Sequence, residues 1–341
     1  MIPRLDIKFP IKRQWCYWFG KEYTPQQGEY LLNHARTGIV MALKASVPEG
    51  RRVGVVAYNC HTVANAVVNA GCTPVFMDVT ERLTIDIESI PNDLDAIVVT
   101  NLFGIRNDIK AIRKRCPKAI IIVDNAHGYG LPAEGDFTVY SINQGKFPAL
   151  GEGGLLYAID DFRLKIDDLY KALPGYGFVG EVKLFVSMLV KAIAYSRCVY
   201  WFTMRLKKSS HPQVHQQVVL RQMAPGVRRL YQAWLPTADA AIAAQKTTAA
   251  LTSERLKKSF EQERDKKELK TECLVGENAF MLIVKTENPM ALLKQFAEHG
   301  VETATHFGRA IEWATEFGYQ LGSCPKAEKL VNHLLMVPTY F

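Results

Sequence analysis

The sequence predicts an α/β protein with a mostly parallel, doubly wound sheet and a smaller α+β domain after it. Between about residues 30 and 160, short apolar runs alternate with segments of helical periodicity. The apolar runs are nearly continuous in valine and isoleucine, as expected for strands that helices cover on both faces. Ligands of such sheets bind beyond the carboxyl ends of the strands. The residues that follow the strands are therefore the candidate functional residues.

The predicted strands and helices follow one another in a regular order. RRVGVVAY (51–58) and TPVFMDV (73–79) are predicted strands on either side of a helix from His61 to Ala70, which Gly71 ends as a C-terminal cap. NDIKAIRKRCPK (107–118) is a predicted crossover helix. The remaining predicted strands are DAIVVTNLFG, AIIIVDNA, DFTVYSI and GGLLYAI.

In the second half of the chain, the sequence predicts a helical region followed by a small domain. Residues 165–235 are predicted to be mostly helical, and residues 237–270 to form one long helix whose later part has a charged, solvated face. The runs ENAFMLIVK, PMALLKQFAEHG, VETATHF and HLLMVPTYF then indicate a smaller α+β domain. We therefore expect a large domain, residues 1–235, and a small domain, residues 236–341.

One part of the helical region, residues 183–208, is very apolar and is flanked by basic residues. A helix that spans a membrane needs about 20 apolar residues. Lys191 and Arg197 interrupt this one, each at a cost of about 3 kcal/mol. The favoured interpretation is a buried helix or a helix at a dimer interface. A helix on a membrane surface and a true span are the alternatives.

Composition indicates a globular protein and limits the classes of partner that it is expected to bind. Of 341 residues, 48% are hydrophobic and 22% charged, and the net charge of +8 suits an anionic partner. Basic residues do not form runs with aromatic ones, so no nucleic-acid partner is expected. The seven cysteines include no C-x-x-C pair, and the N-terminus has no apolar signal core. We therefore expect no metal site and a cytoplasmic location.

Three places at the ends of predicted strands hold residues that could carry chemistry. In HARTGIVMALKA, Thr37 and Gly38 open an apolar helix, and a helix N-terminus suits a phosphate. In VDNAHG, Asp124 directly follows a buried strand. In SINQGKFPALGEGG, Ser141 ends a strand and Lys146 comes five residues later.

Each of these signals has a simpler explanation when it is taken alone: an N-cap without a ligand, a turn-forming aspartate and an exposed loop lysine. Together they supply what pyridoxal phosphate requires, namely an amine for its aldehyde, a carboxylate for its ring nitrogen and donors for its phosphate. A lysine that is removed from water can also lose its proton and act as a nucleophile. We therefore predict that Lys146 and Asp124 are catalytic.

These segments resemble a known family, the DegT/DnrJ/EryC1/StrS family of pyridoxal-phosphate sugar aminotransferases, whose members have the fold-type I architecture. SINQGKFPALGEGG is the most specific match, because the family also has lysine five residues after a serine and Glu-Gly-Gly six residues after that lysine. RTGIVMAL resembles the family's Ser-Gly-Thr helix start, and VDNAHGYG its Glu-Asp-Ala-Ala-Gln. Further similar segments are AGCTPVFMDVTERLTIDIESI, NLFGIRNDIKAI, GVETATHF and CPKAEKLVNHLLMVPTYF.

The resemblance implies roles for individual residues. Lys146 falls on the lysine that binds the cofactor covalently, Asp124 on the aspartate that faces the ring nitrogen, and Ser141 on a serine that binds the phosphate. The other cofactor-binding positions that it implies are Thr37, Gly38, Ile39 and His127, with His61 near the position that stacks on the ring. Asn101 and Glu152 fall on positions that we assign to substrate binding.

The resemblance also implies an activity. It is transfer of an amino group from an amino acid, glutamate by family habit, to a keto sugar linked to a nucleotide, in polysaccharide or glycoconjugate biosynthesis. A homodimer with shared active sites is implied as well.

The chain departs from the family in two places. AYNCHTVANA, with Cys60 or His61, replaces the aromatic residue that stacks on the ring, and YQAWLPTADAA stands where the family has the Asn-Tyr-Arg motif of the partner subunit. One alternative is another pyridoxal-phosphate reaction, although the dehydratases of the family have histidine in place of the lysine. The other is a non-catalytic relative that binds a membrane or a partner through residues 183–208.

Overall fold

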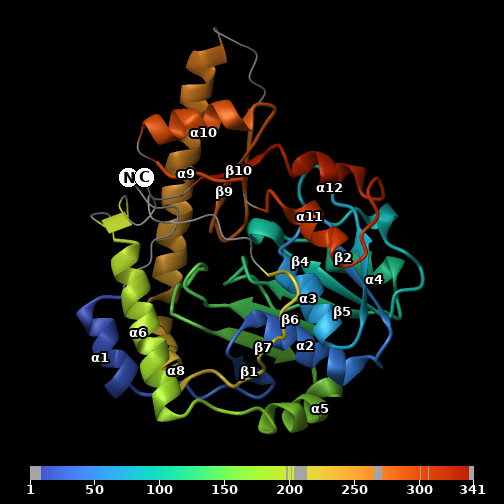
Figure 1. Cartoon of the computed structure of the whole chain (residues 1–341), viewed down its shortest axis with the longest axis vertical. Coiled ribbons are helices and arrows are strands. Elements are labelled where there is room, and N and C mark those ends of the chain that lie inside the picture. The colour runs from blue at the N-terminus through green and yellow to red at the C-terminus, as the bar shows by residue number, and fades with distance from the viewer. Residues whose placement is uncertain are drawn as a thin grey trace.

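The computed structural model describes residues 9–196, 199–200, 202, 213–264, 271–299, 301–305 and 307–337, and these contain two β-sheets (Figure 1). The larger sheet has seven strands in the order β1-β7-β6-β5-β4-β2-β3. They are β1 (Glu29–Leu32), β2 (Arg52–Val56), β3 (Thr73–Met77), β4 (Ala96–Thr100), β5 (Ile120–Asn125), β6 (Phe137–Ser141) and β7 (Gly154–Ala158).

Most of the large sheet is parallel. Strands β6, β5, β4, β2 and β3 all run in the same direction, and β7 is antiparallel to its two neighbours, β6 and β1. Side chains of β4 alternate between two hydrophobic cores, with Ile97 and Val99 in one and Val98 in the other. Burial on both faces explains the continuous Val/Ile runs. The predicted mostly parallel sheet is confirmed, and the antiparallel edge is an addition to it.

Helices and the small domain cover the two faces of this sheet. One core contains apolar side chains of α2 (Ala35–Ser46), α3 (His61–Asn69) and α5 (Asp160–Lys171). The other contains Ile112 of α4 (Ile109–Arg115) together with residues of the small domain. Gly71, with φ of +82°, follows α3 as predicted, because the left-handed conformation that ends the helix favours glycine.

Three helices lie beside the β1 edge. They are α1 (Ile11–Phe19), α6 (Phe178–Ala194) and α8 (Pro225–Trp234). Gly226 of α8 lies directly against the ring of Tyr17, where a Cβ atom would come within 2.3 Å of the ring. Residues 213–224 are not helical, although residues 165–235 were expected to be mostly so. Asn33 holds part of this stretch: its backbone N–H and its side-chain amide donate to the carbonyls of Arg221 and Val219.

The predicted apolar segment 183–208 is described only in part, since residues 197–198, 201 and 203–208 lie outside the described residues. Its first part belongs to α6, which buries Leu184 and Met188 and leaves Val186, Val190 and Ile193 about half exposed. In the described ranges no helix combines the length and the hydropathy that a membrane span requires. The interpretation as a buried helix therefore holds for only one side of α6.

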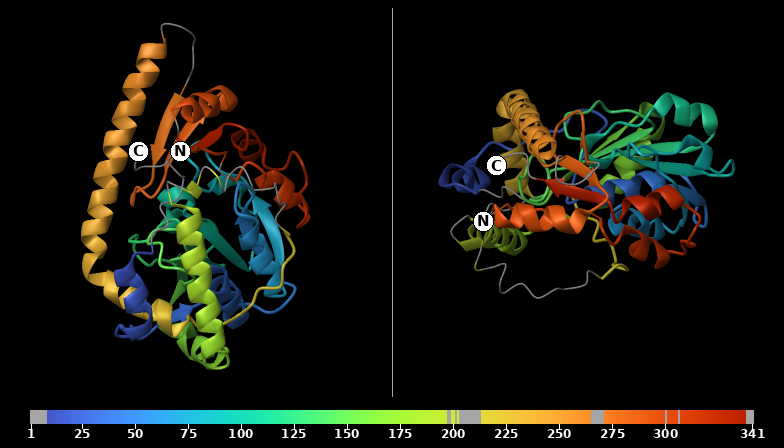
Figure 2. Two further views of the ribbon diagram at one scale, coloured as in Figure 1. Left: turned by 60° about the vertical axis from the view of Figure 1, so that its left-hand side comes forward. Right: turned by 90° about the horizontal axis from the view of Figure 1, so that it is seen from above.

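The expected small domain, residues 236–341, begins with a long helix, α9 (Ala238–Arg264), which runs along the side of the molecule past both sheets (Figures 1 and 2). Its antiparallel sheet has the order β10-β9-β8 and consists of β8 (Thr271–Val275), β9 (Leu282–Thr286) and β10 (Leu334–Val337). Three helices complete it: α10 (Pro289–Glu298), α11 (Ala310–Thr315) and α12 (Pro325–Leu330). In place of a strand, the described part of the run VETATHF contributes isolated bridge residues, one of which pairs Ala304 with Met336. The expected boundary after residue 235 falls within the 3-10 turn η3 (Leu235–Thr237).

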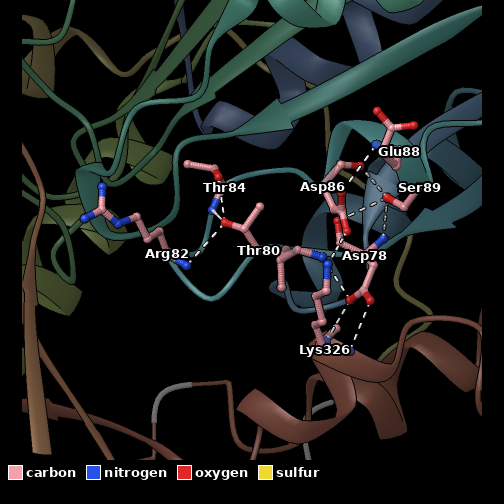
Figure 3. Close-up of polar contacts among 10 residues, drawn as sticks. Asp78, Thr80, Arg82, Thr84, Asp86, Glu88, Ser89 and Lys326 are labelled. Carbon is pink, nitrogen blue, oxygen red and sulfur yellow. Dashed lines mark hydrogen bonds and ion pairs between the residues drawn. The ribbon is translucent and has the colours of Figure 1, made fainter.

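A buried aspartate of the large domain caps a helix of the small domain (Figure 3). Asp78 follows β3 and accepts hydrogen bonds from the backbone N–H groups of Ala327 at 2.7 Å and Lys326 at 3.0 Å, in the first turn of α12. The Lys326 ammonium also pairs with Asp86 at 2.5 Å. We call these four residues the interdomain cap. It joins two segments that resemble the family in sequence, 70–90 and 324–341, through residues about 250 positions apart.

Candidate active site

Polar residues follow four strands at one edge of the large sheet. Thr100 ends β4, Asp124 is the last residue but one of β5, Ser141 ends β6, and Asn59 comes three residues after β2. A chain of hydrogen bonds joins three of them. The Asn59 amide donates to Thr100 Oγ1 at 2.9 Å, and that hydroxyl lies 3.5 Å from Asp124 Oδ2, to which it donates. The edge where ligands of parallel sheets bind is therefore polar and organised around Asp124.

Asp124 is buried, with 3% of its surface exposed. Its Oδ1 atom accepts a hydrogen bond from the Ala126 N–H at 2.9 Å. Burial raises the pKa of the Asp124 carboxyl, and the Ala126 N–H, the charge of Lys146 and the Thr100 hydroxyl offset only part of that rise. These contacts therefore compensate for only part of the cost of burying the Asp124 charge.

Lys146 lies in a folded loop between β6 and β7. The loop is closed by backbone hydrogen bonds from Ile142 to Gly153 and from Gln144 to Gly151, and the Lys146 N–H donates to the Asn143 carbonyl at 2.9 Å. Gly151 has φ of +121°, and a Cβ atom there would come within 2.7 Å of the Met188 sulfur in α6. The loop therefore packs closely on α6, which fixes the position of Lys146.

Lys146 is half-buried, and removal from water lowers the pKa of its ammonium group. The charges of Cys60 and Asp124 raise that pKa, but by less than burial lowers it. Lys146 and Asp124 thus act on each other electrostatically, as their common edge of the sheet predicts. In this environment the Lys146 amine is uncharged, and therefore nucleophilic, more readily than the amine of an exposed lysine.

Cys60 is the third group at this place. It is the N-cap residue of α3, and its sulfur accepts a hydrogen bond from Thr62 Oγ1 at 3.0 Å. Burial raises the pKa of the Cys60 thiol. Contacts with His61 and Thr62 lower it by more than burial raises it, so the net shift is downward. The cysteine therefore has more thiolate character than an ordinary cysteine, and its charge acts on both Lys146 and Arg36.

His61, for which a role on the cofactor ring was expected, has its ring against Trp313 of α11. The two ring centroids are 4.9 Å apart and the planes meet at 67°. The group of this stretch that acts on Lys146 is the neighbouring Cys60. The ring-stacking role of His61 stays a prediction.

Helix α2 begins at Ala35, two residues before the expected start at Thr37 and Gly38. The Thr37 hydroxyl donates to Asn33 Oδ1 at 2.7 Å. Gly38 packs against the sheet, where a Cβ atom would lie 2.8 Å from a methyl group of Val139, and Ile39 is buried in the core. These contacts assign packing roles to the three residues, and their roles in cofactor binding stay predictions.

A polar cluster surrounds Glu152 at the end of the lysine loop. Glu152 accepts a hydrogen bond from the Tyr176 hydroxyl at 2.6 Å and lies 3.5 Å from His34 Nε2. Burial, with help from the nearby Arg36, lowers the pKa of His34 to about 4, although Glu152 acts in the opposite direction. His34 is therefore neutral at pH 7, and the carboxylate faces Arg36, whose pKa is also lowered by burial.

The remaining two expected site residues lie beside Asp124 in neighbouring loops. Asn101 uses its whole side-chain amide within the protein, because it donates to Asn125 at 2.7 Å and accepts from Asn107 at 2.9 Å. His127 is 5% exposed, and its ring lies nearly parallel to the rings of Phe103 and Phe307. Binding of substrate by Asn101 and of cofactor by His127 stay predictions.

Sequence reasoning missed His34, Arg36, Asn59 and Thr100. One available signal was position, since Thr100 directly follows the apolar residues AIVV just as Asp124 follows IIIV. Arg36 directly precedes the Thr37-Gly38 pair and could have been read with it. The contacts of His34 with Glu152 and Asn143 join residues more than 100 positions apart, and no local pattern in the sequence contains them.

The α/β architecture, with its large and mostly parallel sheet, is that of fold-type I pyridoxal-phosphate aminotransferases. Residues 24–185, which include the whole large sheet and the lysine loop, match the model of the DegT/DnrJ/EryC1/StrS aminotransferase family. The resemblance to this family is confirmed over residues 24–185.

Solved structures with the same fold cover nearly the whole chain. Spr1654 of Streptococcus pneumoniae, described as a sugar aminotransferase and solved in its PMP-form, has a TM-score of 0.71 at 14% identity, over 100% of this chain and 94% of that one. The sugar aminotransferase CalS13 of Micromonospora echinospora has a TM-score of 0.68 at 16% identity, over 99% and 95%. At sequence identities this low, these comparisons show a shared fold and do not by themselves show a shared activity.

A third solved structure is the GDP-4-keto-6-deoxy-D-mannose-3-dehydratase of E. coli with bound hydrated PLP, with a TM-score of 0.66 at 18% identity over 96% of this chain and 86% of that one. A search of curated protein sequences gives no match. The family match together with the shared fold confirms the predicted family, the fold class and the class of enzyme, a pyridoxal-phosphate-dependent aminotransferase.

Proposed function

We propose that this protein transfers an amino group from an amino acid, glutamate, to a keto sugar linked to a nucleotide, with pyridoxal phosphate held by Lys146. The observation that carries the proposal is the pairing of Lys146 with Asp124 at the strand ends, where each acts electrostatically on the other. An amine with a lowered pKa and a carboxylate kept from water are what the cofactor's aldehyde and ring nitrogen need.

Residues around this pair fit the phosphate end of the cofactor. Arg36 is half-buried in the first turn of α2, where unpaired N–H groups and the helix dipole favour an anion. Ser141 lies at the end of β6, the strand that leads into the lysine loop. We assign the phosphate to Arg36, Ser141 and the α2 N-terminus, because the Thr37 hydroxyl already donates to Asn33.

Bound there, pyridoxal phosphate supplies an electron sink for the charge that proton removal leaves at the amino acid's Cα. The chain supplies the groups that move and hold protons. Once the amino acid has taken its place on the cofactor, the free Lys146 amine would accept the Cα proton and return it to the adjacent carbon of the cofactor, since its lowered pKa leaves the amine uncharged at a lower pH than in an exposed lysine. The carboxylate of Asp124 would hold the proton on the ring nitrogen of the cofactor.

The finer parts of the proposal rest on the family resemblance and on charge. A net charge of +8 suits an anionic nucleotide-linked sugar, and Glu152 and Asn101 are proposed substrate contacts. We further propose a homodimer with shared active sites, a cytoplasmic location, a role in polysaccharide or glycoconjugate biosynthesis, and the division into domains at residue 235. Lys146 separates this proposal from a sugar dehydratase, because the dehydratases of the family have histidine at that position.

Trapping the cofactor tests the proposal directly. The protein is incubated with pyridoxal phosphate, reduced with borohydride and digested, and the modified lysine is identified by mass spectrometry. We expect the pyridoxyl group on Lys146, a visible absorption band that reduction removes, and neither in Lys146→Ala. Lys44→Ala, which changes an exposed lysine of α2, is the matched control and keeps both.

Modification of another lysine, or no band in a folded protein, contradicts the proposal. In that case a non-catalytic member of the family is the better description. Amino transfer to nucleotide-linked keto sugars, measured with glutamate against other amino acids as donors, then tests the substrates separately from the cofactor.

A further inference from the structure

We propose that one face of the molecule, formed by α1 and α6, docks on an anionic lipid surface. Eight large apolar side chains on these two helices are between 48% and 82% exposed. They are Ile11, Trp15 and Phe19 on α1, and Phe178, Val179, Val186, Val190 and Ile193 on α6. We call them and the side chains between them the α1–α6 face. The inference does not depend on the proposed reaction.

The exposed side chains form stripes and are not scattered. On α1 they recur every fourth residue, opposite the fully buried Tyr17, so they share one side of the helix. On α6, Val179, Val186, Val190 and Ile193 are seven, four and three residues apart, which again places them on one side. That side is turned away from Leu184 and Met188, which α6 buries.

The two stripes adjoin each other. The helices pack through aromatic rings, with Trp18 and Phe178 at 6.2 Å and Tyr17 and Phe185 at 5.3 Å between centroids. One of these joining residues on each helix, Trp18 on α1 and Phe178 on α6, lies next to the exposed stripe, by the helical repeat of 100° per residue. The apolar surface is therefore continuous across both helices, which lie side by side at the outside of the molecule (Figures 1 and 2).

Positive charge borders this apolar surface. Lys12 follows Phe19 around α1, Lys183 follows Val190 around α6, and both are exposed, so each lies at the outer border of its stripe. Helix α1 has no acidic residue, and the single acid of α6, Glu181, accepts a hydrogen bond from the Gly226 N–H at 3.2 Å. An apolar strip with Trp and Phe and a lysine at each border fits the pattern of helices that lie in the plane of an anionic membrane surface.

A second copy of the chain fits this face less well than lipid does. In a two-fold symmetric dimer the same patch meets itself, so Lys12 and Lys183 of both copies would come together with no acidic residue of these helices left to pair with them. Like charges at an interface are unfavourable. An anionic bilayer neutralises these cations and at the same time removes the apolar side chains from water.

Vesicle flotation of the full chain tests the proposal. We expect binding to vesicles of phosphatidylcholine mixed with phosphatidylglycerol, little binding to pure phosphatidylcholine, and weaker binding in high salt. The double variants Trp15→Ser with Phe178→Ser, and Lys12→Glu with Lys183→Glu, should each bind about tenfold more weakly. The control is Met290→Ser with Leu321→Ser, which changes two side chains that are equally exposed outside the face and should bind like the wild type.

Three results would overturn the proposal: no binding of the wild type to the mixed vesicles, equal binding to neutral vesicles, or binding that survives in both face variants. Mass from light scattering distinguishes the rival occupant. If the serine variant turns a dimer into a monomer while the wild type ignores vesicles, the face joins two copies of the chain and the proposal fails. Circular dichroism confirms that each variant is folded.

Discussion

Burial acts in opposite directions on the two groups that face each other in the candidate site. It raises the pKa of the Asp124 carboxyl and lowers the pKa of the Lys146 ammonium, and the attraction between the two charges offsets only part of each shift. Both groups are therefore drawn toward their neutral forms. An uncharged amine is the form that attacks an aldehyde, so the environment prepares Lys146 for the proposed reaction.

Replacing Asp124 by Asn should leave the fold intact and remove most of the activity. An amide of the same shape fills the buried space, but it cannot hold a proton on a ring nitrogen. We expect kcat to fall by a factor on the order of 10²–10⁴, with a thermal unfolding midpoint close to that of the wild type. Activity at the wild-type level in Asp124→Asn would assign the ring nitrogen to another residue.

Replacing Cys60 by Ser should make Lys146 reactive at lower pH. The negative charge of Cys60 raises the pKa of Lys146, and a serine hydroxyl carries no such charge, so that pKa falls further. The measurement is the rate at which pyridoxal phosphate and borohydride label Lys146, followed against pH. We expect the profile of Cys60→Ser to move to lower pH, while Cys16→Ser, a change far along the chain in α1, leaves it in place. A shift to higher pH would contradict the electrostatic role of Cys60.

The positions of Lys146 and Asp124 in the fold could be predicted because the strand ends and the spacing of the lysine loop are visible in the sequence. The environment of these residues could not. The side chains around Glu152 come from the start of α2 and from the segment before α6, and their approach depends on how the sheet is assembled. Likewise, the sequence shows Thr37 at a helix start, but only the structure shows that its hydroxyl donates to Asn33.

At the scale of elements, the interdomain cap explains how α12 is held. The residue before this helix, Cys324, makes no capping hydrogen bond with its side chain. Asp78 supplies that function from the large domain, since both of its carboxylate oxygens accept N–H groups of the first turn. The helix is thereby tied to the end of β3, and one side chain serves both helix and domain contact.

Removal of the Asp78 carboxylate should loosen this contact. In Asp78→Ala the buried Ala327 N–H and the partly buried Lys326 N–H lose their partner. A buried N–H without a partner costs about 1–3 kcal/mol, so we expect a loss of about 2 kcal/mol in the free energy of unfolding. Urea unfolding measures it, and proteolysis near α12 should become faster. Glu88→Ala, a substitution nearby that leaves Asp78 in place, is the control. Equal stability of Asp78→Ala and the wild type would mean that the cap contributes nothing.

The elements of the parallel sheet were predicted well, because strands buried on both faces leave long Val/Ile runs and α3 ends at a glycine. The antiparallel edge was not predicted as such. Strand β1 has only four residues, and its place beside β7 depends on a pairing more than 120 residues apart. Residues 213–224 were expected in a helical region, but they take their conformation from hydrogen bonds with Asn33 and Leu31.

At the scale of the whole molecule, buried charge near the site links function to stability. His34 stands at the start of α2, and the groups that act on its charge are Arg36 on the same helix, Glu152 in the lysine loop and Lys191 on α6. Burial and the two cations outweigh the carboxylate, so His34 stays neutral until the pH approaches about 4. Three separate elements thus contribute to the charge state of one residue.

The stability of the protein should therefore fall as the medium becomes acidic. In the unfolded chain His34 takes up a proton near pH 6.5, whereas in the folded chain it does so only near its lowered pKa of about 4. Between these values the unfolded state binds the extra proton. The contribution of the neutral His34 to the free energy of unfolding is fully present above pH 6.5 and is lost as the pH falls to 4. Its upper limit is about 3 kcal/mol.

The variant His34→Gln isolates this effect, because glutamine fills a similar space and does not titrate. Unfolding midpoints of both proteins in urea, measured from neutral pH down to about pH 4, should converge: the wild type loses stability faster on acidification. Asp124, whose raised pKa has the opposite effect on stability, is present in both proteins and cancels in the difference. If the midpoints of the two proteins change with pH in parallel, His34 is charged in the folded state or reaches solvent. The proposed electrostatic link between α2, the lysine loop and α6 would then be wrong.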